Sequence, residues 1–232
     1  NTKSNSNAGF IADWTDYDGW YYMIYAGRTE GNTHARRGDN RLALARSKNL
    51  TDWHKPGKGE KFIDWNQLKN PVYSHPGWST KDACMLYRNG NFYIYFSAFY
   101  HYKGRERSHV VGVKTKDFKT YSDPLFKWNG YFDGWTGMCS PNVTRKGNKY
   151  YMTYNSWGDD HKNGMKNQLF YAVSEDLENW RYHKPLAWNV TVDKNGDQVR
   201  AIDAAVAFFN NKVYLCWKEV QTPMMAVADK IG

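Results

Sequence analysis

Residues 82–97, DACMLYRNGNFYIYFS, read as two β-strands joined by a tight turn. Asn-Gly between two apolar runs is the strongest short-range signal for a β-hairpin, and it places the turn at Asn89-Gly90. The second run alternates with a period of two, so that Phe92, Ile94 and Phe96 point to one face of the strand and the two tyrosines between them point to the other. These residues predict an antiparallel hairpin with an acid at its beginning.

The hairpin pattern occurs four times along the chain. Its turns lie at Asp18-Gly19, Asn89-Gly90, Gly147-Asn148 and Asn210-Asn211. The first three copies are followed by a second motif, (S/T)-x-(D/N)-(L/F)-x-x-(W/Y), whose closing aromatic residue comes 31 to 34 residues after the turn glycine. The copies of this motif are residues 47–53, 115–121 and 174–180. A constant interior with variable connections indicates one supersecondary unit, repeated with loops inserted at its rim.

Each copy reads as strand, tight turn, strand, loop, strand, Ser/Asp turn and a short strand. Four antiparallel strands per repeat are typical of a β-propeller blade, and no segment keeps a helical apolar period over about 11 residues. We therefore expect an all-β chain that forms a single β-propeller domain over 1–232. Its blades are predicted at about 10–56, 80–126, 138–186 and 200–232. The fourth stops after three strand signals, so we expect three full blades plus an incomplete fourth, with the C-terminal end truncated.

Composition and charge narrow the class of partner. Aromatic residues make up 17 % of the 232 residues, which suits pleated, half-buried surfaces. No run of about 18 apolar residues exists, so no membrane partner is expected. The formal net charge of +9 favours an anionic partner, such as a sulfated or uronic-acid glycan. Because the Lys and Arg residues are scattered and no helical or zinc-finger reader accompanies them, we do not expect nucleic-acid binding.

The three cysteines, Cys84, Cys139 and Cys216, have no CxxC spacing, and their odd number argues against a disulfide framework. Each lies in or beside a predicted strand, where a free cysteine is usually a small buried hydrophobe. The seven histidines show no metal-ligand spacing. We therefore expect free, buried cysteines and no metal site.

The hairpin followed by the Ser/Asp motif resembles the five-bladed β-propellers of glycoside hydrolase family 43 and of related families 32, 62 and 68. The resemblance extends from about Phe10 to the C-terminus. It implies a five-bladed propeller and a secreted or periplasmic glycosidase that requires no cofactor. Some relatives hold one calcium ion, so a structural calcium is compatible with it. The resemblance also implies three carboxylates in a central funnel: an Asp that acts as base or nucleophile, an Asp that orients, and a Glu that protonates the leaving group.

Two strand segments match the family's Asp-Pro-x-Val pattern apart from Ala in place of Pro. Residues 82–85 are Asp-Ala-Cys-Met and residues 203–206 are Asp-Ala-Ala-Val. The resemblance gives the orienting role to Asp82, and we expect Asp203 to face the same funnel.

The family's acid and base positions hold other residues in this chain. The Glu-Gly-Pro of the family aligns with Cys139-Ser140-Pro141, and the Asp expected in the first blade falls at Asn7. We expect Glu219, which ends the second strand of the fourth blade and neighbours Asp203 across that hairpin, to replace the acid; Asp203 itself is the other candidate. Asp13, or the nearby Asp16, is expected to replace the base.

Five further residues are expected to bind substrate. His75 and Trp78 precede the inner strand of the second blade, and Trp135 precedes that of the third. An aromatic face stacks on the apolar C–H face of a sugar, although each ring could instead fill a blade edge. Asn142 follows the Cys-Ser-Pro segment, and Arg200 comes shortly before an inner strand, where it could pair with a substrate hydroxyl or carboxylate.

Two main functions remain open at this stage. The first is a glycoside hydrolase that cleaves arabinofuranoside, xyloside or galactoside bonds in a plant or algal type of polysaccharide or oligosaccharide. The alternative is a non-catalytic glycan-binding propeller that has lost the acid/base pair, and a third interpretation is a structural scaffold in a larger enzyme. Both main functions take a carbohydrate partner, and neither predicts an oligomeric state.

Overall fold

A computed structural model describes residues 2–5, 10–11, 18–29, 40–56, 70–102, 105–128, 137–157, 167–186, 201–219 and 222–231. Over these ranges the chain is all-β and contains no helix, which confirms the predicted fold class at this level. Accordingly, the described part contains no helix long and apolar enough to cross a membrane. The chain divides into two compact units. Unit 1 comprises Asn1–Glu106 and Val111–Lys127, and unit 2 comprises Arg107–Val110 and Trp128–Gly232.

The first repeat forms a sheet in unit 1. Its strands are β1 (Thr2–Asn5), β2 (Phe10–Ile11), β3 (Tyr21–Thr29) and β4 (Asn40–Ser47). Strand β3 is central, because it pairs antiparallel with β4 on one side and with β1 and β2 on the other. An isolated antiparallel bridge between Arg46 and His54 lies where the fourth strand is predicted.

The second repeat has four strands, which lie in unit 1 apart from Arg107–Val110 and Trp128. Its strands are β5 (Ser79–Arg88), β6 (Asn91–Tyr102), β7 (Arg105–Thr115) and β8 (Phe126–Trp128). The predicted turn is confirmed: Asn89 (φ 50°) and Gly90 (φ 78°) both adopt the left-handed conformation that a two-residue type I′ hairpin requires. The strand order within this repeat is β5-β6-β7-β8.

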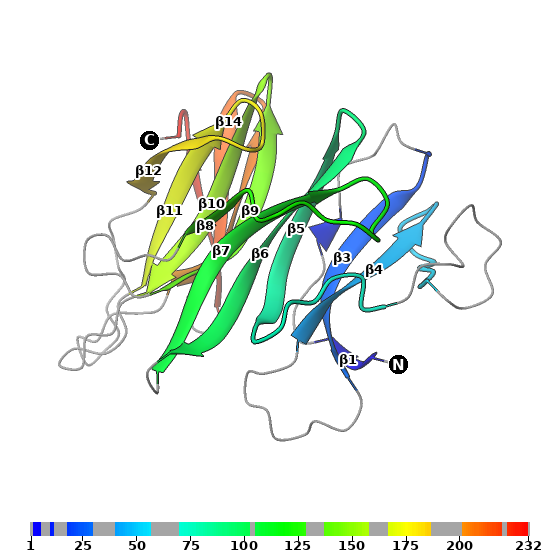
Figure 1. The fold of residues 1–232 in the computed structure, drawn as a ribbon. Helices are drawn as coiled ribbons and strands as arrows, with labels where there is room; N and C mark the ends of the chain where they lie inside the picture. Colours follow the sequence, from blue (N-terminus) through cyan, green and yellow to red (C-terminus); the bar gives the residue numbers. More distant parts are fainter. Residues whose placement is uncertain are drawn as a thin grey trace. The chain divides into compact units, whose positions relative to one another are not determined.

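The third and fourth repeats, whose strands run from yellow-green to red in Figure 1, lie in unit 2. The third has four strands: β9 (Gly137–Lys146), β10 (Lys149–Trp157), β11 (Asn167–Ser174) and β12 (Trp180–Pro185). The fourth has three: β13 (Ala201–Phe209), β14 (Lys212–Glu219) and β15 (Thr222–Ala228). Consecutive strands in each repeat pair antiparallel, and Ser108 in the β7 segment of unit 2 pairs in parallel with Gly137.

The Ser/Asp motif forms the same hydrogen-bonded turn wherever it occurs. In the third repeat Ser174 Oγ accepts hydrogen bonds from the N–H groups of Asp176 and Leu177, and Asp176 Oδ1 accepts from those of Glu178 and Asn179. The Asn179 side chain also donates a 2.7 Å hydrogen bond to Asp176 Oδ2. Burial alone would raise the pKa of Asp176, but the hydrogen bonds that its carboxylate accepts, led by this one, outweigh burial and hold that pKa well below its usual range.

Equivalent bonds form in the first two repeats around Asn49 and Asp117. The residue after each Asp or Asn is left-handed: Leu50 (φ 65°), Phe118 (φ 56°) and Leu177 (φ 70°). The motif is therefore a structural turn, and its carboxylates are used by their own backbone.

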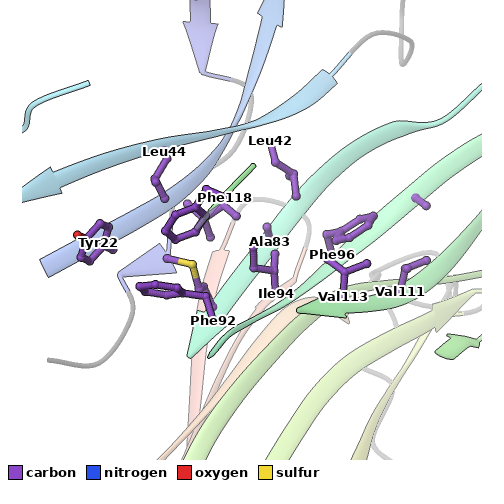
Figure 2. Packing of buried hydrophobic residues seen from close by; sticks show 13 residues of the cluster. Tyr22, Leu42, Leu44, Ala83, Phe92, Ile94, Phe96, Val111, Val113 and Phe118 are labelled. Carbon is purple, nitrogen blue, oxygen red and sulfur yellow. The ribbon is translucent and has the colours of Figure 1, made fainter. Parts of the chain in front are cut away.

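The core of unit 1 lies between the sheets of its two repeats. Leu42 and Leu44 of β4 face Phe92, Ile94 and Phe96 of β6, and all five side chains are fully buried (Figure 2). Burying a side chain of this size contributes roughly 1.5–3 kcal/mol.

The other face of β6 is buried as well. Tyr93 is 6 % exposed and Tyr95 is 0 % exposed, with the Tyr95 ring stacked on Phe126 at 5.9 Å. The alternation of Phe and Tyr therefore distinguishes two buried faces and does not separate core from solvent.

The core of unit 2 joins its two repeats in the same way. Leu169 of β11 packs with Val206 and Leu215 of the fourth repeat. The rings of Tyr151 and Phe208 lie 5.0 Å apart across the same interface. Strand β13 is thereby held against the strands β9 to β12.

All three cysteines are free, as predicted. Cys84 and Cys139 are buried, but the prediction of burial is wrong for Cys216, which is exposed. Cys216 pairs with Ala205 on one side and with the exposed Met225 on the other, on the sheet face opposite Leu215. A strand with period-two alternation cannot show by itself which of its faces is covered.

Candidate functional site

Asp82 lies in a β-bulge. Lys81 pairs with Ser97 and Cys84 with Tyr95, so Asp82 and the next residue together oppose a single residue of β6. Asp82 has φ 53°, a left-handed conformation that is uncommon for a residue with a side chain. Strand β5 begins three residues earlier, at Ser79, so Asp82 does not start the inner strand as the sequence suggested. The bulge redirects its side chain within a continuing strand.

The same bulge recurs at Asp203 in unit 2. Ile202 pairs with Lys218 and Ala205 with Cys216, which leaves Asp203 and its neighbour opposite one residue of β14. Asp203 has φ 57° and lies two residues after the start of β13.

A third copy of the bulge lies in β9. Cys139 pairs with Asn155 and Asn142 with Thr153, and Ser140 has φ 55°. By position in its strand, Ser140 corresponds to the two aspartates. Sequence reasoning missed it because it looked for carboxylates; the alignment of Ser140-Pro141 with Asp82-Ala83 was the available signal.

The Asp82 carboxylate is largely covered. Its side chain is 11 % exposed, and Oδ2 lies 3.9 Å from Lys81 Nζ. The same ammonium group lies 4.4 Å from the centre of the Phe99 ring. Unit 1 therefore presents Asp82 beside a cation.

The Asp203 carboxylate is exposed and is held from the neighbouring repeat. Ser140 Oγ donates a hydrogen bond of 2.7 Å to Asp203 Oδ1. One residue further on, the buried Thr153 hydroxyl donates a 2.7 Å bond to the Ala204 carbonyl. Two hydroxyl groups of the third repeat thus hold the bulge of the fourth repeat: Ser140 binds the Asp203 side chain, and Thr153 binds the backbone carbonyl of Ala204.

Glu219 is a buried carboxylate, 7 % exposed, at the end of β14. Trp217 Nε1 donates a 2.9 Å hydrogen bond to Glu219 Oε1. Glu219 pairs with Ala201, so it lies two positions along from Asp203 and not directly across the hairpin. The bulge accounts for one of these two positions, because without its extra residue the register of the hairpin would place Glu219 opposite Ile202.

Cys139 occupies the position where the family resemblance expects the acid. It is 8 % exposed, and Asn155 Nδ2 donates a 3.0 Å hydrogen bond to its sulfur. Asn142, a predicted substrate contact, is half-buried, and its carbonyl lies 3.4 Å from Thr153 Oγ1. The Asn155 pairing was not foreseen, since the two residues are 16 positions apart.

His75 and Trp78 lie together in unit 1. Their rings stack at 3.7 Å with an interplanar angle of 18°. Trp78 also packs against the unit 1 core, and Lys127 Nζ lies 5.2 Å from its ring centre. Stacking on His75 uses one face of each ring, so a sugar would have to contact an edge or the opposite face.

Asp13, Trp135 and Arg200 lie outside the described residues, as do Asn7 and Asp16. Within the described ranges, no group of three or more His, Cys, Asp or Glu side chains is arranged to hold a metal ion. Asp82 belongs to unit 1, whereas Asp203 and Glu219 belong to unit 2.

No protein-family model matches the chain. No curated protein sequence matches it either. Solved structures do match at the level of fold.

A thermostable family-43 glycoside hydrolase is 17 % identical, covers 94 % of this chain and 69 % of its own, and gives a TM-score of 0.61. An N-acetylgalactosamine deacetylase from F. plautii, in complex with blood group B trisaccharide, is 14 % identical over 96 % of this chain and 66 % of its own, with a TM-score of 0.68. The family 32 β-fructofuranosidase BmSUC1 from Bombyx mori is 14 % identical over 93 % and 43 %, with a TM-score of 0.56.

These likenesses show the fold. The chain has the β-propeller type of fold found in family 43 and family 32 glycoside hydrolases, and it spans about two thirds or less of the length of these structures.

Proposed function

We propose that this protein is a glycoside hydrolase that acts on arabinofuranoside, xyloside or galactoside linkages of a plant or algal type of glycan. The observation that carries the proposal is the repeated left-handed bulge, which presents Asp82 in one unit and Asp203 in the other in the same backbone conformation. Left-handed residues with side chains are costly, and they concentrate at functional sites. Bulges that redirect a side chain are also over-represented next to active sites.

The carboxylates are assigned as follows. Glycoside cleavage uses two carboxyl groups in different roles, one to donate a proton and one to act as base or nucleophile. Unit 2 offers two carboxyl groups in different surroundings, Asp203 exposed and Glu219 buried beneath an indole N–H. We assign proton donation to Glu219 or Asp203, orientation to Asp82, and the base to Asp13.

The remaining features of the proposal follow from the fold and the charge. The propeller is proposed to have five blades, and the protein is proposed to act in the periplasm or outside the cell. His75, Trp78, Trp135, Asn142 and Arg200 are the proposed substrate contacts. A formal net charge of +9 favours glycans that carry sulfate or uronic acid.

The test is a screen of 4-nitrophenyl α-L-arabinofuranoside, β-D-xyloside and β-D-galactoside, followed by Asp82→Asn, Asp203→Asn and Glu219→Gln on any substrate that is cleaved. Loss of a proton-transfer group costs about 10²- to 10⁴-fold in rate. Asp229→Asn is the matched control, because Asp229 is an exposed carboxylate of the same unit that pairs only with Lys212 among the contacts described. Full turnover in both Asp82→Asn and Asp203→Asn would remove this site assignment.

One observation favours the second candidate, a non-catalytic glycan-binding propeller. Cys139, which the sequence resemblance aligns with the family's acid, is buried and hydrogen-bonded to Asn155. A binding protein would bind sulfated or uronic-acid oligosaccharides in a titration and release no 4-nitrophenol from any of the three probes. Calorimetric titration of the same variants would then show whether Asp82 and Asp203 contribute to binding.

A further inference from the structure

Of the three left-handed bulge residues, Asp82, Ser140 and Asp203, only Ser140 has an uncharged side chain. Its φ of 55° is a conformation that glycine adopts freely and that serine adopts at a cost. What the side chain adds is a hydroxyl group, which donates to Asp203 Oδ1 at 2.7 Å. The two residues are 63 positions apart and lie on strands β9 and β13 of unit 2.

The backbone of the Asp203 bulge is already held without Ser140. The Thr153 hydroxyl, fully buried, donates to the Ala204 carbonyl at 2.7 Å. Ala204 is itself packed in the unit 2 core. The bond from Ser140 therefore acts on a different degree of freedom, the rotation of the exposed Asp203 side chain.

An exposed aspartate on a strand has several rotamers available to it. A hydrogen bond to a charged carboxylate is stronger than one between neutral groups, so a single well-placed donor restricts that choice. The donor must itself be fixed, and the left-handed bulge fixes the direction of the Ser140 Cα–Cβ bond.

We propose that Ser140 is a positioning residue, whose hydroxyl holds the Asp203 carboxylate in the orientation needed for attack on, or protonation of, a glycosidic bond. This inference rests on the function proposed above. It assigns no contact with substrate to Ser140: the residue acts through Asp203.

Three replacements of Ser140 separate positioning from folding. Ser140→Ala and Ser140→Gly both remove the hydroxyl, but glycine relieves the backbone cost whereas alanine keeps it. Ser140→Asn keeps a donor, and Asn tolerates the left-handed region. If Ser140 positions Asp203, kcat falls by about three- to tenfold in both the Ala and Gly variants, KM changes less than about twofold, and Asn restores part of the loss.

The substrate is whichever of the three 4-nitrophenyl glycosides the wild-type protein cleaves, with thermal unfolding measured on every variant. Rates that follow stability, with Gly near wild type and Ala impaired, overturn the positioning role, as do unchanged rates in both. The Asp203→Asn variant distinguishes failure of the proposed catalytic site from failure of the positioning role of Ser140. Full activity in Asp203→Asn refutes the proposed site together with this inference, whereas an inactive Asp203→Asn beside fully active Ser140 variants refutes only the inference.

A crystal structure of Ser140→Gly tests the same point without turnover, including the case in which none of the three probes is cleaved. An Asp203 side chain spread over several rotamers, with the Ala204 carbonyl still bound by Thr153, supports the positioning role. A single Asp203 rotamer identical to that of the wild-type protein overturns it.

Discussion

Gly137 opens strand β9, three residues before Ser140, and lies directly opposite Trp157 in the β9–β10 pair. A Cβ atom added at Gly137 would overlap the Cε2, Nε1 and Cζ2 atoms of the Trp157 indole. That indole is 9 % exposed, and its Nε1 donates a 2.9 Å hydrogen bond to Ser108 Oγ. We predict that Gly137→Ala displaces the indole and strongly destabilises unit 2.

The magnitude follows from two costs. Overpacking a filled site costs about 1–3 kcal/mol, and breaking the bond between Trp157 and Ser108 adds about 0.5–1.5 kcal/mol. The expected loss of unfolding free energy is therefore about 1.5–4.5 kcal/mol, measured by urea denaturation with tryptophan fluorescence. Gly90→Ala is the control: at φ 78° and with nothing within 4 Å of its Cβ, it should cost only the backbone penalty of about 1–2 kcal/mol.

A double variant tests the mechanism. In Gly137→Ala combined with Trp157→Leu, the leucine leaves room for the alanine methyl group, so the two losses should sum to more than the loss of the double variant by about 1–3 kcal/mol. Strict additivity, or a Gly137→Ala variant no less stable than Gly90→Ala, would refute the steric argument.

Three further predictions concern local structure. Hydrogen bonds lower the pKa of Asp176 in the folded state, so its ionised form stabilises the fold above the unfolded pKa of about 4. In acid-unfolding curves, the difference in stability between the wild-type protein and Asp176→Ala should therefore shrink as the pH falls from 5 to 2. A difference that stays constant over this range would contradict the prediction. Asn70→Ala should lower the free energy of unfolding in urea by about 1–3 kcal/mol, because the Asn70 side chain accepts a hydrogen bond from the Leu44 N–H and donates one to the Leu44 carbonyl in β4. A loss smaller than that of an Asn→Ala control at an exposed position would count against this prediction. Under native conditions iodoacetamide should alkylate the exposed Cys216 well before the buried Cys84 and Cys139, as read by peptide mass spectrometry; equal rates would show that the two buried thiols are accessible.

The sequence alone determined the features whose hydrogen bonds close within a few residues. The turn at Asn89-Gly90 follows from residues that accept left-handed backbone, and the Ser174–Asp176 turn follows from side chains that bond the backbone two or three positions on. Repetition of these local signals was enough to predict an all-β chain built from antiparallel hairpins. The resemblance of the repeat to family 43 propellers then indicated the fold that the solved structures share.

Tertiary structure decided everything that depends on contacts between strands distant in sequence. Alternation in β6 did not reveal that Tyr95 is as buried as Phe96, and in β14 it did not reveal that Cys216 faces outward, because covering a face requires another sheet. The bulges at Asp82, Ser140 and Asp203 arise from the pairing register, which no single strand specifies. Side-chain direction at the candidate site was therefore set by partners up to 63 residues away, where local propensity carries no information.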